Sequence, residues 1–291
     1  MKTIFRRTYE SVQPAFPVSH SLVVFQSTLG YIGTPAWAGL HLSLEKDLTM
    51  KVDVLAIGAH PDDIELACGG TVALFVKQGY TVGLADLTRG ELGTRGTDTI
   101  RAKEAEQAAA IFGAATRLNL RIPDGNIEVS QSNIIKVVSL LRELQPKILL
   151  IPHSVERHPD HVHAHYLCKE ACFFAGLVKI KTKSNGKDQS PHRPANFFEF
   201  MQWYQFQPTF IVDISVTFET KMKAIRAHAS QFHNPKSKEP ETVLSKPEFL
   251  EQIEADSRHF GTRIGVKYGE PFYSYAPVGI KSFFDLTMKK G

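Results

Sequence analysis

The hydrophobic positions along the chain fall into short continuous runs that alternate with longer segments of helical spacing. Four apolar runs predict strands that are buried on both faces: 52–58, 80–87, 116–120 and 147–152. Four segments that follow these runs predict helices: 64–78, 98–112, 131–145 and 160–176. This repetition predicts an α/β fold with a Rossmann-like, mainly parallel sheet that is flanked by helices and joined by right-handed crossovers.

The pattern is less regular towards the C-terminus. A polar stretch with Gly and Pro at 181–194 predicts a surface loop. The predicted elements beyond it are two strands, two helices and a closing strand: 196–204, 209–214, 216–230, 247–260 and 271–276. We therefore expect residues 50–291 to form a single domain.

Residues 1–49 differ from the rest of the chain. They contain scattered Pro and Gly without a clean period, and the regular pattern begins directly after Met50. We expect them to be a poorly ordered extension, or upstream sequence that is not part of the native chain. The alternative is an arm that packs on the domain.

Composition narrows the classes of protein to consider. The 291 residues are 43% hydrophobic and 22% charged, which is ordinary for a globular protein. A formal net charge of +4 without a long Lys/Arg block argues against a nucleic-acid partner and fits a small anionic substrate. Three Cys make no disulfide framework, and no run reaches the roughly 18 apolar residues of a membrane span. We expect a cytoplasmic protein without a membrane partner.

Two short motifs rich in His and Asp dominate the candidate chemistry. Residues 59–65 read AHPDDIE, residues 157–161 read RHPDH, and each motif follows an apolar run that predicts a buried strand. Open α/β sheets build their sites in the crevice beyond the carboxyl ends of their strands. We therefore expect the two loops to meet at that edge and to hold one divalent metal ion.

The predicted metal ligands are His60, Asp63 and His161. The first two are three residues apart, so one turn can direct both at a common ion, and the second motif supplies the third. A catalytic zinc takes three such ligands and keeps a position open for water. The set suits one Zn²⁺ per chain, although iron or manganese also tolerates it. Further histidines near the second motif are expected outside the ligand set: His153, His163 and His165.

Asp62 and His158 are the predicted catalytic residues of the two motifs. Asp62 is left free beside the metal, where a carboxylate can act as the general base towards water. His158 can act as an acid or polarise a developing oxyanion, and Asp160 is expected to orient a histidine through its second nitrogen. A single His-Pro-Asp run is more often only a helix start, but two such runs after apolar strands favour a shared site.

These motifs resemble those of the PIG-L/LmbE-type zinc N-deacetylases, which remove the acetyl group from N-acetylglucosamine conjugates. The runs at 86–97 (DLTRGELGTRGT), 230–232 and 237–242 are similar to the bacillithiol-biosynthesis branch, whose members deacetylate N-acetyl-α-D-glucosaminyl L-malate. The resemblance covers about residues 50–286. It implies zinc-dependent hydrolysis of that conjugate to glucosaminyl malate and acetate, by a homo-oligomer.

The resemblance also implies roles for particular residues. It places zinc on the three ligands named above, with Asp62 as base and His158 as its partner. It implies that Arg101 and Arg157 face the substrate, in agreement with the forked binding of carboxylates by guanidinium groups. Arg95 is a further candidate for this contact. His228 stands where the family has a Tyr that helps to hold the oxyanion, so we expect its imidazole to donate there.

Other interpretations of the same residues remain open. One is a related amidase or deacetylase that acts on another N-acetyl sugar or a thiol conjugate. Another is a non-catalytic metal- or sugar-binding protein on the same fold, although such a protein has no need of the free carboxylate of Asp62. A nucleotide-binding Rossmann protein needs a Gly-rich first turn, whereas residues 58–62 read GAHPD.

Overall fold

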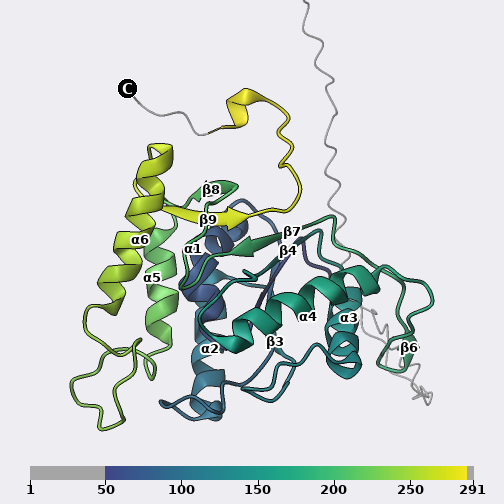
Figure 1. Ribbon diagram of the computed structural model, residues 1–291, viewed down its shortest axis with the longest axis horizontal. Helices are drawn as coiled ribbons and strands as arrows, with labels where there is room; N and C mark the ends of the chain where they lie inside the picture. The colour runs from purple at the N-terminus through teal and green to yellow at the C-terminus, as the bar shows by residue number, and fades with distance from the viewer. Residues whose placement is uncertain (1–49, 287–291) are drawn as a thin grey trace, which may run out of the picture. The chain divides into compact units, whose positions relative to one another are not determined.

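The central feature of the fold is a seven-stranded sheet, seen in a computed structural model that describes residues 50–286 (Figure 1). Its strands are β1 (Val54–Gly58), β2 (Val82–Asp86), β3 (Thr116–Asn119), β4 (Ile148–Pro152), β7 (Asn196–Phe200), β8 (Phe210–Asp213) and β9 (Gly269–Tyr273). They are ordered β3-β2-β1-β4-β7-β9-β8. The first five are parallel, and β9 runs antiparallel to both β7 and β8. The predicted mainly parallel α/β fold is confirmed, while the expectations for residues 1–49 lie outside the described residues.

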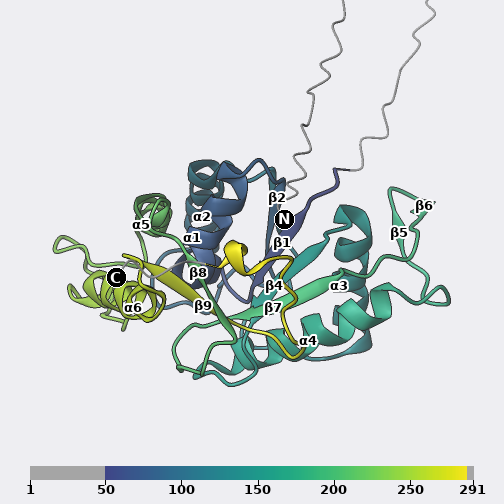
Figure 2. The same cartoon turned by 90° about the horizontal axis from the view of Figure 1, so that it is seen from above.

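Six α-helices lie within residues 50–286: α1 (Asp63–Lys77), α2 (Asp98–Phe112), α3 (Gln131–Leu144), α4 (Pro159–Ala175), α5 (Phe218–Ala227) and α6 (Phe249–Ile264). Alternate residues of β1 point to opposite faces. Leu55 and Ile57 join the core formed with α3 and α4, whereas Val54 and Ala56 join the core formed with α1 and α2. Figure 2 shows these two helical layers on either side of the sheet. No helix within residues 50–286 is long and apolar enough to cross a membrane.

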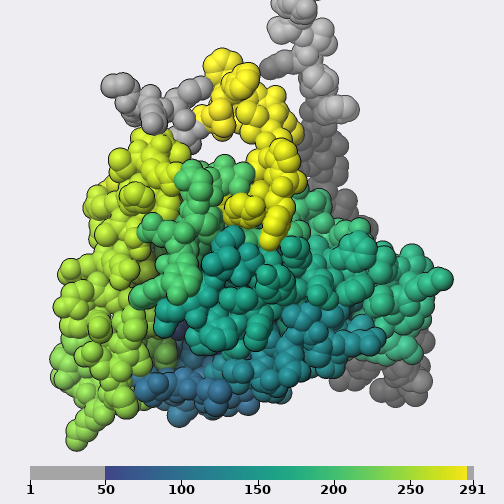
Figure 3. Space-filling view, viewed as in Figure 1, coloured from purple at the N-terminus to yellow at the C-terminus, as the bar shows by residue number. Residues whose placement is uncertain are grey.

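The C-terminal part forms a third, smaller core beside the sheet. Residues after β8 and from α5 and α6, among them Ile214, Phe218 and Phe249, pack together with Tyr268. In the space-filling view the yellow-green residues of this part stand beside the blue and teal residues of the N-terminal half (Figure 3). Segments that are distant in the sequence therefore share one surface.

Several predicted boundaries in the C-terminal half need correction. The predicted loop 181–194 carries a small hairpin of β5 (Lys183–Ser184) and β6 (Lys187–Asp188). The predicted helix 216–230 ends at Ala227, since His228 leaves the helical conformation with φ −79° and ψ 51°. The predicted helix 247–260 continues as α6 to Ile264 and ends at Gly265, whose positive φ of 77° closes it.

A close approach between α1 and the segment after β8 depends on Gly70. A Cβ atom at this position would lie 2.7 Å from Cδ1 of Ile214, so only glycine lets the backbone come this near. We predict that Gly70→Ala lowers the free energy of unfolding by about 1–3 kcal/mol, the usual cost of overpacking a core. Urea titration measures this change. Gly279→Ala, where a Cβ has nothing within 4 Å, is the control, and equal unfolding midpoints for the two variants would contradict the packing argument.

Candidate metal centre and active site

The two motifs meet because β1 and β4 are parallel neighbours in the sheet. Val54 pairs with Ile148 and Ala56 with Leu150, so both strands end at the same edge. The turn after β1 leads into α1, which begins at Asp63, and the loop after β4 leads into α4, which begins at Pro159. Pro159 occupies the first turn of α4, whereas Pro61 lies in the turn before α1 and not in the helix.

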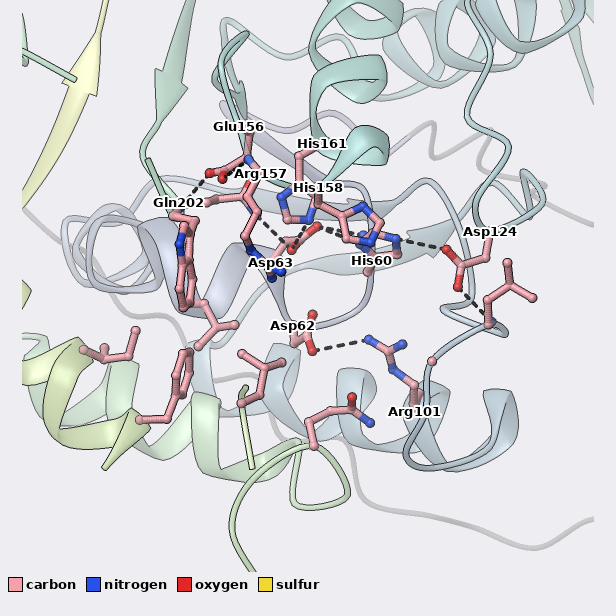
Figure 4. Close-up of a pocket in the computed structure, with 18 of the residues that line it drawn as sticks. His60, Asp62, Asp63, Arg101, Asp124, Glu156, Arg157, His158, His161 and Gln202 are labelled. Carbon is pink, nitrogen blue, oxygen red and sulfur yellow. Dashed lines mark hydrogen bonds and ion pairs between the residues drawn. The ribbon is translucent and has the colours of Figure 1, made fainter. Parts of the chain in front are cut away.

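His60, Asp63 and His161 form a group that fits a metal ion. One possible ligand atom from each lies within 4.8 Å of the others. Nε2 of His161 is 3.1 Å from Oδ1 of Asp63, and Nδ1 of His60 is 3.6 Å from Oδ2 of Asp63. Atoms that share a tetrahedral zinc at about 2.0–2.2 Å are separated by distances of this order. The sequence-predicted ligands are therefore brought together (Figure 4).

The charges around this group also suit a cation. The side chains of four carboxylates are at most 6% exposed: Asp62, Asp63, Asp124 and Asp160. Burial opposes the ionisation of Asp63, yet the neighbouring His161 and His60 hold the pKa of its carboxyl well below the usual range. So much buried negative charge is costly unless cations balance it, and a divalent ion would do so.

Two of these carboxylates orient the ring of His60. Nε2 of His60 lies 3.0 Å from Oδ1 of Asp124 and 3.4 Å from Oδ2 of Asp160, and that Asp160 oxygen also accepts a hydrogen bond from the backbone N–H of Gly125 at 2.7 Å. The contact of Asp160 was expected. Asp124 was missed, although it follows the third predicted strand in a Pro-Asp-Gly turn whose position could have identified it. His60, His158 and Asp160 also form an alternative metal group.

Asp62 lies beside the metal group but does not belong to it. Its backbone has φ 129° and ψ −25°, a conformation that costs free energy for a residue other than glycine. Nη2 of Arg101 contacts Oδ2 of Asp62 at 3.3 Å and donates to the carbonyl oxygen of Pro61 at 2.8 Å, which holds the turn. Burial raises the pKa of the Asp62 carboxyl, and the charge of Arg101 opposes this rise.

The predicted substrate contact of Arg101 stays a prediction, and the structure shows which partners its guanidinium already has. Arg101 lines the cavity, but its Nη1 donates to the carbonyl oxygen of Gly90 at 3.0 Å and its Nη2 is used by Pro61 and Asp62. Gly90 has φ +67°, and a Cβ atom there would overlap the guanidinium. Glycine at position 90 therefore lets Arg101 lie against the turn that carries Asp62.

His158 faces the cavity from the start of α4. Its Nδ1 accepts a hydrogen bond from the backbone N–H of Asp160 at 3.2 Å. Its ring stacks on His161 with centroids 5.0 Å apart and meets His60 edge-on at 4.8 Å. Partial burial, with the nearby charges of His60 and His161, lowers the pKa of His158. The neutral ring with its proton on Nε2 is thus favoured, so it can donate a hydrogen bond.

Two predicted site residues do not reach the cavity. His228 is fully buried at the end of α5, where its Nε2 lies 3.5 Å from Oε2 of Glu65 and it lines no part of the cavity. Arg95 donates from Nε to the carbonyl oxygen of Ser230 at 3.0 Å and so holds the segment after α5. The predicted oxyanion contact of His228 and substrate contact of Arg95 stay predictions that this geometry does not support.

The three further histidines lie outside both metal groups, as expected. His153 Nδ1 is 2.5 Å from Glu199, a buried carboxylate of β7, and His165 Nδ1 is 3.1 Å from the carbonyl oxygen of Pro152. His163 is exposed on α4.

A cavity of about 340 Å³ opens onto the metal group. Gln202, just beyond β7, donates from Nε2 to Oδ1 of Asp63 at 2.9 Å. The adjacent Trp203 lines the cavity, and the backbone N–H groups of Trp203 and Arg157 both donate to Glu156, at 2.6 and 2.5 Å. The remaining walls include Leu92 of the run 86–97 and residues that no motif indicated: Leu66, Leu244, Phe249, Gln252, Ile253 and Asp256. A volume of this size accommodates a small organic ligand.

The sheet delivers two His, one Asp and the carboxylate of Asp62 to one cavity, an arrangement that suits metal-dependent hydrolysis. Residues 55–172 match the family model described as PIG-L: GlcNAc-PI de-N-acetylase. The chain is 31% identical over 231 residues to the diacetylchitobiose deacetylase of Thermococcus kodakarensis, covering 75% of this chain and 80% of that protein. The chain belongs to the PIG-L family of N-deacetylases.

More distant relatives differ in their named activities. The probable N-acetyl-α-D-glucosaminyl L-malate deacetylase 2 of Bacillus cereus is 25% identical, over 62% of this chain and 84% of that protein. The 4-oxalmesaconate hydratase of Pseudomonas putida is 28% identical, over 64% of this chain and 76% of that protein.

The crystal structure of the conserved protein TT1542 from Thermus thermophilus superposes with a TM-score of 0.72 at 35% identity, covering 80% of this chain and 98% of that one. This chain therefore shares the fold of that structure.

The geometry predicts that His161→Ala weakens the binding of a divalent metal by more than about 100-fold, because removal of one of three ligands costs at least as much as loss of an orienting partner. Calorimetric titration of metal-free protein with Zn²⁺ measures the affinity. His163→Ala, an exposed histidine on the same helix, is the control and should bind like the wild type. Unchanged stoichiometric zinc in His161→Ala would remove this residue from the ligand set.

Proposed function

We propose that the protein is a zinc-dependent N-deacetylase that removes the acetyl group from an N-acetylglucosaminyl compound. In this proposal one Zn²⁺ per chain is held by His60, Asp63 and His161. The observation that carries it is the convergence of these residues from two loops while Asp62, a buried carboxylate, stays outside the group. A cytoplasmic location and a homo-oligomeric state accompany the proposal.

Asp62 acts as the general base in this reaction. Its carboxylate accepts a proton from the attacking water and later delivers it to the leaving amine nitrogen. Burial raises its pKa towards the range in which a base works well, and Arg101 keeps it aimed at the cavity. The bound metal supplies Lewis-acid polarisation of the substrate amide and makes water more acidic.

His158 stabilises the oxygen of the tetrahedral intermediate. Its Nδ1 is used by the backbone of α4, so the proton of the neutral ring resides on Nε2. A donor that is fixed in this way before the reaction begins costs little reorganisation when charge develops on the amide oxygen.

The part of the substrate beyond the N-acetyl sugar has two candidates. The malate conjugate expected from the sequence is supported by Arg157, whose guanidinium lines the cavity and makes no hydrogen bond to the described residues. A second sugar unit is supported by the identity to a diacetylchitobiose deacetylase and by the aromatic and aliphatic wall that includes Trp203 and Phe249. A hydratase activity, by contrast, would release no acetate.

The function is tested by incubating zinc-loaded protein separately with N-acetylglucosaminyl malate and with N,N′-diacetylchitobiose, while acetate and free amine are followed. We predict that Asp62→Asn lowers kcat by about 10²–10⁴-fold, the usual contribution of a general base, and keeps its zinc. Metal analysis of the assayed sample is the control. Full turnover at equal zinc content would exclude Asp62 as the base.

The role of Arg157 is tested with the same substrates. If malate is recognised by this guanidinium, Arg157→Ala raises KM for the malate conjugate by about tenfold, the effect of losing one charge-assisted pair. The KM for N-acetylglucosamine changes much less in that case. An equal effect on both substrates would show that Arg157 serves the sugar and not malate.

A further inference from the structure

The wall of the cavity contributed by α6 has its own chemistry. Phe249, Gln252, Ile253 and Asp256 all line the cavity, and their spacing of three, four and seven residues places them on one helical face. In Figure 4 the yellow-green ribbon of this part lies across the cavity from His158 and His161. A substrate whose acetamide group is at the metal would extend its remaining part towards this wall.

Asp256 is the ionisable group on this wall. Its side chain is half-buried and also lines a smaller adjoining cavity of about 90 Å³. It makes no hydrogen bond or ion pair with any residue in the described range, and burial raises the pKa of its carboxyl. The other acidic group away from the metal, Glu156, is already used by two backbone N–H groups. Asp256 is therefore the carboxylate that remains for a ligand.

Arg157 is a cationic residue of the same cavity. Arg157 directly precedes His158, and Figure 4 shows it beside Asp63. Its guanidinium is 4.8 Å from the centre of the Trp203 ring. Asp256 supplies a negative charge on the α6 wall, towards which the rest of the substrate would extend.

We propose that Asp256 is a specificity-determining residue that selects N-acetylglucosaminides with neutral or cationic aglycones and rejects anionic ones. Its carboxylate accepts hydrogen bonds from hydroxyl or ammonium groups of the aglycone and repels carboxylates such as those of malate. The apolar neighbours Phe249 and Ile253 provide the surface on which a sugar ring or alkyl chain rests. This inference rests on the proposed deacetylase function and decides between its two candidate substrates.

The test uses three glycosides of N-acetylglucosamine with aglycones of similar size and different charge: 2-carboxyethyl, propyl and 3-aminopropyl. Acetate release by zinc-loaded protein is measured at pH 8, where a carboxyl is ionised. In the wild type, kcat/KM for the anionic glycoside is expected to be about tenfold below that for the neutral one, and this ratio should shrink at high salt. Asp256→Asn should bring the three values within about twofold of one another.

Glu251→Gln is the matched control, because it removes the same charge from an exposed position of α6 outside the cavity. This variant should keep the wild-type order of kcat/KM values among the three glycosides. An Asp256→Asn enzyme that retains the wild-type ratios would overturn the inference, as would a wild type that prefers the anionic glycoside. If Asp256→Asn does not fold, the wild type alone tests the inference. A wild-type ratio of kcat/KM between the anionic and neutral glycosides that does not change with salt would contradict it. Failure of the wild type to release acetate from all three glycosides would instead refute the deacetylase function.

Discussion

The parallel pairing of β1 with β4 is the constraint on which the site depends. Both strands are buried apolar runs, and their register brings their carboxyl ends to the same edge of the sheet. The turns that follow then deliver His60 and Asp63 from one side and His161 from the other. If another strand lay between β1 and β4, about 4.8 Å would be added to this separation, and one ion could no longer reach all three side chains.

Charge balance is the second condition of the site. Carboxylates crowd around His60, and a divalent ion bound there would offset their charge. Arg101 keeps one of the carboxylates, Asp62, in a backbone conformation that non-glycine residues avoid. The strain is local to the residue assigned as base, which agrees with the general occurrence of such outliers at functional sites.

Local signals account for what the sequence predicted well. The bounds of α2 are those expected, because Thr97 caps its start and Gly113, with φ 74°, ends it. The metal group follows from motif spacing and from the position of the motifs after strands. The contacts of His228 and Arg95 could not be predicted because their partners are distant in the sequence: Glu65 for the imidazole, and a carbonyl oxygen after α5 for the guanidinium. The cavity wall of α6 also arises from tertiary packing, which no local pattern encodes.

A crystal structure of the zinc-loaded protein, with anomalous diffraction recorded at the zinc edge, tests the central claim most directly. The account predicts one peak within about 2.0–2.2 Å of a nitrogen of His60, an oxygen of Asp63 and a nitrogen of His161, with Asp62 uncoordinated. The three side chains form one of two candidate groups among the described residues. A peak held instead by His60, His158 and Asp160, or one coordinated by Asp62, would contradict the account.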